Sequence, residues 1–238
     1  METIDISYHL GLPDGRDERF DVCLDPQTLL PVEPHSGELP DWTRLDWQQC
    51  PHCPWSVQDH PHCPVALRLI PVVSRLGGVR SYDELALEVT FEQRTLAAVT
   101  SAQEGISSLV GLLIATSGCP HTEFLKPMAR FHLPLSSAEE TLYRVVSMYA
   151  MSCLLRMRKG QSFAADFDDL IHRYQAMRIV NRFVADRLKL VDEEGSTVNG
   201  IILLDYTAQL VPVSLNEEIE ELENLFHGYL RDPGPKPR

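Results

Sequence analysis

The chain has 238 residues, with 21 Lys and Arg against 34 Asp and Glu, so its formal net charge is −13. A hydrophobic content of 44% and a charged content of 23% are typical of a globular protein and exclude general disorder. The acidic balance argues against a nucleic-acid partner, which needs clustered Lys and Arg. No apolar run approaches the roughly 18–20 residues of a membrane span, and the N-terminus shows no signal-peptide pattern. We therefore expect a cytoplasmic protein in a reducing compartment, with no nucleic-acid or membrane partner.

The first hundred residues predict a sheet. Residues 3–10 and 19–24 alternate polar and apolar side chains on either side of a Gly- and Pro-containing turn, which predicts a hairpin. Residues 33–49 contain two tryptophans, so we expect an extended loop that docks on the protein rather than a free linker. Residues 84–100 predict two more strands on the same sheet, with a turn near Gln93.

Helical patterns dominate the remaining chain. A helix that begins at Pro64 and ends before Gly77 is expected to contain Pro71, which would remove one of its hydrogen bonds. The patterns Ser-x-x-Glu at Ser101 and Ser137 predict capping boxes at two helix starts. The predicted helices of the body cover residues 101–118, 137–159, 163–190, 198–210 and 215–230.

The fold class that follows is α+β, with an N-terminal antiparallel sheet of about four strands packed on a mostly helical C-terminal body. We expect a single domain over residues 1–238. Residues 1–100 supply the sheet and a Cys-rich metal-binding loop at 50–64, residues 101–231 the helical body, and residues 232–238 a disordered tail.

The six cysteines divide into two sets by the residue that follows each of them. Four are followed by proline, whereas chance pairing with 17 prolines gives fewer than one such pair. Cys23 and Cys153 are followed by leucine in apolar-patterned segments, and we interpret them as small buried hydrophobic residues. The four cysteines of the Cys-Pro set are Cys50, Cys53, Cys63 and Cys119.

This set predicts a metal site. Cys50 and Cys53 have the CxxC spacing that lets two thiolates meet one ion, Cys63 can return through a short loop, and Cys119 is the best candidate for a fourth ligand. A structural four-cysteine zinc site is the first reading. A 4Fe-4S cluster on the same cysteines is the second, and four reduced thiols without metal is the third. A redox CxxC is disfavoured by Pro54.

Histidines beside the cysteines leave the ligand set open. His60 or His62 could complete a zinc site with three of the cysteines, and His52 and His121 are also adjacent. For each of them separately, an exposed loop position without a ligand role is the simpler interpretation.

A polar strip follows Cys119. If residues 129–133 are extended, Arg130 and His132 share one face and could bind a small anion or nucleotide. Arg144 lies within plausible reach, in the first turns of the next predicted helix. No nucleophile elbow and no phosphate loop accompanies the strip, so the simpler reading is a structural pairing with Glu139 or Glu140.

A set of short motifs resembles an uncharacterised bacterial family, a domain of unknown function. The motifs are Leu39-Pro-Asp-Trp-Thr43, Cys50-Pro-His-Cys-Pro54, Cys63-Pro-Val-Ala66, Ser117-Gly-Cys-Pro120, Pro127-Met-Ala-Arg-Phe-His-Leu-Pro134 and Glu139-Glu-Thr141. The resemblance would cover nearly the whole chain. It implies a bacterial, cytosolic protein in which the Cys-Pro residues and the Arg130–His132 strip form one region, and it implies no activity.

The sequence thus favours a metal-binding protein that acts by binding or regulation, on an unknown protein or a small anion. An iron–sulfur redox protein or enzyme is the alternative from another class, and an anion or nucleotide sensor at Arg130 and His132 is the third. The sequence does not decide whether the protein is an enzyme.

Overall fold

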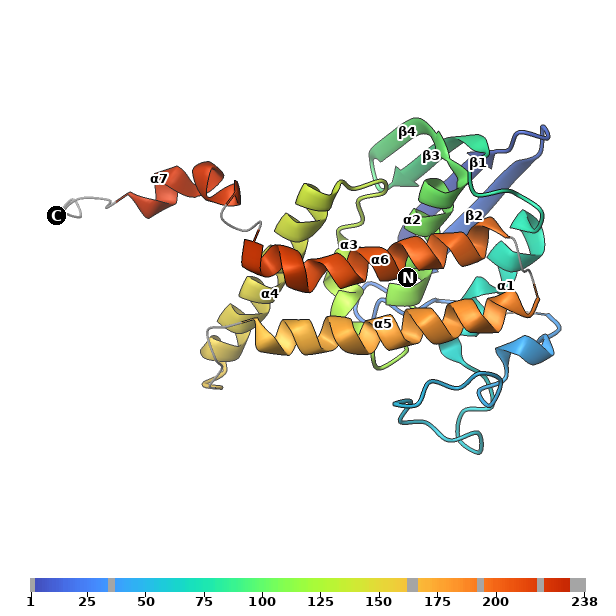
Figure 1. Cartoon of the computed structure of the whole chain (residues 1–238), viewed down its shortest axis with the longest axis horizontal. Coiled ribbons are helices and arrows are strands. Elements are labelled where there is room, and N and C mark those ends of the chain that lie inside the picture. The colour runs from blue at the N-terminus through green and yellow to red at the C-terminus, as the bar shows by residue number, and fades with distance from the viewer. Residues whose placement is uncertain (1–2, 34–36, 162–166, 192–194, 218–220, 232–238) are drawn as a thin grey trace.

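A four-stranded antiparallel sheet forms the N-terminal part of the protein (Figure 1). The computed structural model describes residues 3–33, 37–161, 167–191, 195–217 and 221–231. The strands are β1 (Ile4–Gly11), β2 (Asp17–Leu24), β3 (Glu84–Phe91) and β4 (Arg94–Ser101), in the order β2-β1-β3-β4. Both predicted hairpins and their common sheet are therefore confirmed.

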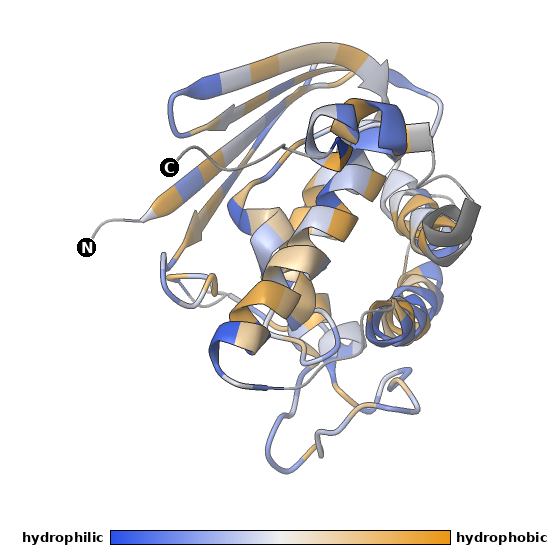
Figure 2. Ribbon diagram, turned by 90° about the vertical axis from the view of Figure 1, so that its left-hand side faces the viewer, coloured by the Kyte–Doolittle hydropathy of each residue, from blue (hydrophilic) through white to orange (hydrophobic). Residues whose placement is uncertain are grey.

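Alternation along the strands gives the sheet one buried face. Along β1 the buried positions are Ile4, Ile6, Tyr8 and Leu10, at the period of two that places them on the same side. Tyr8 lies opposite Phe20 of β2 and Val89 of β3, so the apolar face continues across the strands. The helices cover this face (Figure 2).

The helices of the described residues are α1 (Pro64–Leu76), α2 (Ala102–Ala115), α3 (Lys126–Arg130), α4 (Ala138–Arg158), α5 (Asp168–Lys189), α6 (Ser196–Glu217) and α7 (His227–Leu230). The starts of α1, α2, α4 and α6 lie within two residues of the predicted ones, whereas the start predicted at residue 163 lies outside the described residues and α3 was not predicted. Short 3-10 turns lie at Asp41–Thr43, Glu123–Leu125 and Glu221–Phe226. Ser101 caps α2 by accepting from the Glu104 backbone N–H, and Ser137 begins α4 with a complete capping box.

Two expectations about the helices are wrong. The sequence predicted that the helix beginning near residue 198 ends at Leu210, before Pro212, but α6 continues to Glu217. Its packing along α5 and α2 outweighs the missing proline hydrogen bond. The separate helix expected over 215–230 is replaced by the end of α6, a 3-10 turn and α7. The predicted tail at 232–238 lies outside the described residues.

Two apolar cores hold these elements together. The larger one joins the sheet to α1, α2 and parts of α5 and α6, and α2 contacts β3, β4 and α6. The smaller one lies among α4, α5 and α6 and includes Cys153, as expected for a buried cysteine. Cys23 is exposed, which corrects the expectation that it is buried, because it alternates with the buried Val22 and Leu24 on β2. The single-domain organisation stays a prediction.

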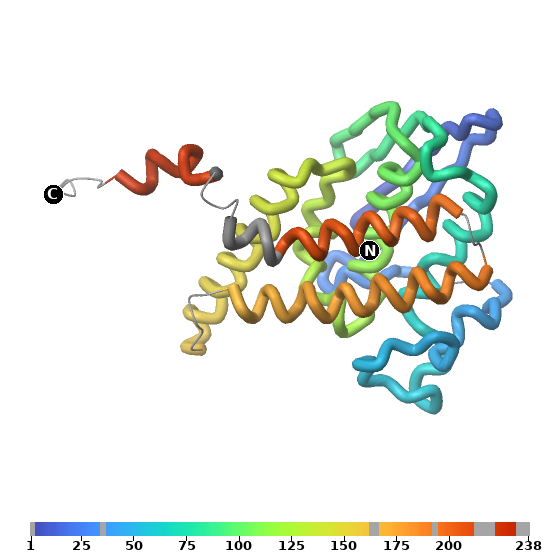
Figure 3. Tube along the Cα trace, viewed as in Figure 1, coloured from blue at the N-terminus to red at the C-terminus, as the bar shows by residue number. Residues whose placement is uncertain are grey.

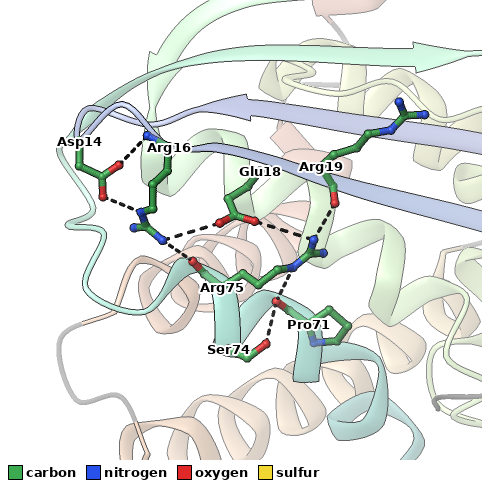
Figure 4. Close-up of polar contacts among 7 residues, drawn as sticks. All are labelled: Asp14, Arg16, Glu18, Arg19, Pro71, Ser74 and Arg75. Carbon is green, nitrogen blue, oxygen red and sulfur yellow. Dashed lines mark hydrogen bonds and ion pairs between the residues drawn. The ribbon is translucent and has the colours of Figure 1, made fainter. Parts of the chain in front are cut away.

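Polar contacts attach the first hairpin to α1, the helix that follows the cysteine loop (Figure 4). The Arg75 guanidinium donates to the Arg19 carbonyl at 2.8 Å and lies 3.8 Å from the Glu18 carboxylate. Arg16 donates in turn to the Arg75 carbonyl at 3.0 Å. Arg75 also donates to the carbonyl of Pro71, which lies inside the helix as predicted. The position of α1, and of Cys63 at its N-cap, is thereby fixed to the sheet.

Candidate functional site

Residues 37–63, which precede α1 and carry Cys50, Cys53 and Cys63, form a loop, the cysteine loop, beside the C-terminal half of α5 (Figure 3). Its two ends pair with each other: the Leu45 N–H donates to the Pro61 carbonyl and the Cys63 N–H to the Thr43 carbonyl, each at 2.8 Å. An isolated bridge between Arg44 and His62 continues this pairing. The pairing places Cys63 at the base of the loop that carries Cys50 and Cys53.

The cysteines themselves lie at chain turns. The Cys53 N–H donates to the Cys50 carbonyl at 3.0 Å, so the CxxC motif is a tight turn. Cys119 follows Gly118, whose φ of 87° is the left-handed conformation that glycine adopts readily. This turn reverses the chain after α2, and the Cys119 N–H donates to the Ser117 hydroxyl at 3.2 Å. All four cysteines of the Cys-Pro set are free thiols of intermediate exposure.

A pair of histidines connects the CxxC turn to the Cys119 turn. The rings of His52 and His121 stack with their centroids 3.9 Å apart, and His121 Nε2 donates to the His52 carbonyl at 2.9 Å. His52 Nε2 contacts the Ala176 carbonyl of α5 at 3.0 Å. Two segments that lie some 70 residues apart in the sequence are therefore in direct contact, as the choice of Cys119 requires.

The tautomer of His52 follows from this contact. A carbonyl can only accept, so Nε2 carries the proton and Nδ1 carries the lone pair. Nδ1 is buried and has no hydrogen-bond partner in the part of the chain that is described. Burial lowers the pKa of His52, which keeps the ring neutral. A neutral imidazole that donates one nitrogen to a carbonyl and keeps the other free has the arrangement of a metal-ligating histidine.

The four thiols influence one another electrostatically. Burial, followed by the neighbouring Cys63, Cys119 and Cys53, raises the pKa of Cys50 to about 12. Burial also raises the pKa of Cys119 to about 11, although the backbone N–H of His121 acts in the opposite direction. The four sulfurs therefore share one region, in which several thiolates would repel each other without a bound cation.

Arg187, near the end of α5, joins this helix to the loop that carries Cys50 and Cys53. The residue is 2% exposed, and its guanidinium donates to the carbonyls of Trp42 and Arg44, with a longer contact of 3.5 Å to the Gln48 carbonyl. Burial lowers its pKa, while Cys63 and Cys50 act to raise it. Sequence reasoning missed this residue, because an arginine near a helix C-terminus is ordinarily explained by the helix dipole.

The histidines first considered as alternative ligands have other contacts. His60 stacks on Trp55 with ring centroids 3.9 Å apart, and His62 Nδ1 lies 2.8 Å from the Thr43 hydroxyl. Across the described ranges, no group of three or more His, Cys, Asp or Glu side chains is already arranged as a metal-ligand set. The four cysteines therefore do not close on a common centre in the described part of the chain.

Arg130 and His132 do not form the expected strip. Residues 126–130 are helical rather than extended, and Pro127 in the first turn of α3 favours that helix. Arg130 pairs with Glu92 at 3.0 Å, whereas His132 Nε2 lies 2.5 Å from the Tyr8 hydroxyl. Neither contacts Glu139 or Glu140 in these interactions, and Glu140 instead completes the capping box with Ser137. The prediction that residues 129–133 are extended is therefore wrong, and Arg130 and His132 contact different partners.

Comparisons with known proteins give one match. A family model described as a domain of unknown function (DUF6901) covers residues 6–227. No curated protein and no solved structure matches the chain. Among the described residues, no helix has the length and apolarity needed to cross a membrane.

Proposed function

The chain belongs to the DUF6901 family, whose function is unknown, and from its own side chains we propose that its four Cys-Pro cysteines bind one zinc ion. The ligands are Cys50, Cys53, Cys63 and Cys119. The observation that carries the proposal is the contact between His52 and His121, which holds the CxxC turn against the Cys119 turn.

The chemistry of the donor set fits zinc. Thiolates are preferred zinc ligands, and a bound divalent cation would offset the repulsion among the thiolates that form when the metal displaces the thiol protons. The sulfurs have to move closer than they stand, because no ligand set is closed in the described part of the chain. The cysteines lie on turns and on a loop, where such an adjustment is less costly than inside a helix.

His52 is the histidine that the contacts favour as an alternative ligand. Its buried Nδ1 has a free lone pair and no partner among the described residues, whereas His62 Nδ1 already contacts Thr43. A site of three cysteines and His52 is therefore the second form of the same proposal.

The role we propose for zinc is structural. By joining loop 50–64 to the turn after α2, it would fix a surface with which a bacterial, cytoplasmic protein binds an as yet unidentified partner. Zinc supplies no electrons in this role. Metal binding would be coupled to the order of the loop, so removal of the metal would lower the stability of the fold.

Elemental analysis of protein purified under anaerobic, reducing conditions tests the proposal. We expect a colourless protein with one zinc per chain, and loss of that zinc in Cys119→Ser. The exposed Cys23 outside the set gives the matched control, because Cys23→Ser should keep its metal.

Three results would count against this assignment. A brown protein with absorbance near roughly 400 nm would contradict zinc and indicate an iron–sulfur cluster on the same cysteines. Equal zinc in Cys119→Ser and the wild type would exclude Cys119 as a ligand, and loss of zinc in His52→Ala would then identify the substitute. Protein that binds no metal under these conditions would leave four reduced thiols and end the proposal.

A further inference from the structure

A cavity of about 540 Å³ lies among the helices α2 to α6, and none of the four Cys-Pro cysteines lines it. Its wall is mainly apolar and includes Leu112, Met128, Met177 and Leu204. The volume falls within the range of about 300–1,000 Å³ that is usual for small-molecule sites. The helices that surround it are labelled in Figure 1.

One end of the cavity carries a cation without a counter-ion. Arg144 of α4 donates through Nη2 to the carbonyls of Met128 and Phe131, each at 3.0 Å. Burial lowers the pKa of Arg144, and Glu140, one turn earlier, acts to raise it, but the Glu140 carboxylate completes the capping box, and no described carboxylate lies within ion-pair distance of Arg144. A partly buried guanidinium is costly without an anion, so this end is suited to accept one.

Two more groups at this end favour an acceptor over a donor. The Tyr174 hydroxyl is buried close to Arg144. Among the described residues, its one hydrogen-bond partner is the Met128 sulfur, at the long distance of 4.0 Å. His132 also lines the cavity, and burial followed by the charge of Arg144 lowers its pKa to about 4, so it remains neutral. One positive charge and the Tyr174 hydroxyl thus lie at this end of the cavity, and the neutral His132 adds no second charge.

The second polar position lies two turns further along α5. Asn181 is 1% exposed and lines the cavity, and its Nδ2 has no hydrogen-bond partner among the described residues. Seven residues separate it from Tyr174, which corresponds to about 10 Å along the helix axis. An unpaired buried amide donor is rare in folded proteins, and this one belongs to a side chain in the mainly apolar wall of the cavity.

We propose that this cavity binds a medium-chain carboxylic acid that carries a hydrogen-bond acceptor near its far end. The carboxylate accepts from Arg144 and Tyr174, the hydrocarbon chain contacts the apolar wall, and the distal acceptor meets Asn181 Nδ2. The inference uses none of the cysteines and therefore does not depend on the proposed zinc site.

Calorimetric titration of the full chain with three ten-carbon probes, each below its micellar or solubility limit, tests the proposal. The probes are decanoic acid, 10-hydroxydecanoic acid and 1-decanol, which differ only in the two polar ends. We expect the hydroxy acid to bind most tightly, and decanol to bind at least about tenfold more weakly than decanoate, because a charge-assisted hydrogen bond is lost.

Variants then assign each end of the ligand. Arg144→Gln should weaken both acids at least about tenfold and leave decanol unchanged, while Arg144→Lys, which keeps the charge, should retain part of the affinity. Asn181→Leu should weaken the hydroxy acid but not decanoate. Arg130→Gln, which alters an exposed ion pair that does not line the cavity, is the matched control.

Several outcomes would overturn the proposal. Equal affinity for decanol and decanoate, or unchanged decanoate affinity in Arg144→Gln, would exclude a carboxylate on Arg144. Equal loss of both acids in Asn181→Leu would exclude a distal acceptor. Absence of binding by all three probes to folded protein would exclude the ligand class. Should Arg144→Gln not fold, Arg144→Lys and Asn181→Leu still decide between these results.

Discussion

Arg187 should be the strongest single attachment of the cysteine loop to the helical body. Replacing it with methionine keeps an unbranched side chain of similar length but removes every donor. The Trp42 carbonyl would then lose its guanidinium partner, while the Arg44 carbonyl would keep the Trp47 N–H at 3.2 Å. The two carbonyls are therefore affected unequally.

The expected magnitude follows from these contacts. An acceptor left unpaired in a buried position costs about 1–3 kcal/mol, and losing one of two hydrogen bonds costs about 0.5–1.5 kcal/mol. Relief of the buried positive charge offsets part of this loss. We expect Arg187→Met to lower the free energy of unfolding by about 2–3 kcal/mol and to increase the reactivity of the loop thiols toward a thiol reagent.

Urea unfolding of Arg187→Met and of a matched variant on the same helix measures this effect. Arg173 pairs with Asp169 at 3.2 Å with both side chains almost half exposed, so Arg173→Met should cost less than about 0.5 kcal/mol. The reasoning would be refuted by equal midpoints for the two variants, or by unchanged thiol reactivity in Arg187→Met.

Two further predictions concern the cavity in the absence of ligand. Burial, as the largest cause, lowers the pKa of His132 from 6.5 to about 4 in the folded chain. The unfolded chain therefore binds this proton more readily, and the free energy of unfolding should fall by about 3 kcal/mol as the pH is lowered from 6.5 to 4. Urea midpoints across this range should show a flatter pH dependence in His132→Gln but not in His9→Gln, an exposed control. An unpaired buried donor destabilises the fold by about 1–3 kcal/mol, so Asn181→Leu, which removes this donor, should raise the melting temperature. Asn199→Leu, which breaks an existing hydrogen bond to Ser81, should lower it. A lower melting temperature in Asn181→Leu would contradict the unpaired state.

Local signals were sufficient for the sheet and for most helix starts. The hairpin of β1 and β2 follows from alternation and a turn, and Ser137 marks its helix through a capping box that needs no distant contact. The prediction was wrong where distant packing decides. α6 passes through Pro212 because it packs along its neighbours, and Cys23 is exposed because its apolar neighbours take the buried face of β2.

The candidate site was only partly accessible to sequence reasoning. Proline after each of four cysteines led to the predicted ligand set, which stays a prediction, and the structure brings the Cys119 turn into contact with the CxxC turn through His52 and His121. The alternation at residues 129–133 wrongly predicted an extended segment, because Pro127, just before it, favours the first turn of helix α3. Arg187 and Asn181 carry no sequence signal, since their roles arise from loops and helices that meet only in the folded chain.

Helix α5 contributes to both proposed sites through different faces. Tyr174, Met177 and Asn181 follow the spacing of three and four residues that places side chains on one face, and all three line the cavity. Ala176 and Arg187, which contact the cysteine loop, are eleven residues apart, close to three full turns, and so share another face. The two faces are rotated by about 120° from each other. A substitution on one face therefore leaves the other intact, and metal content and acid binding can be measured on the same variants as independent properties.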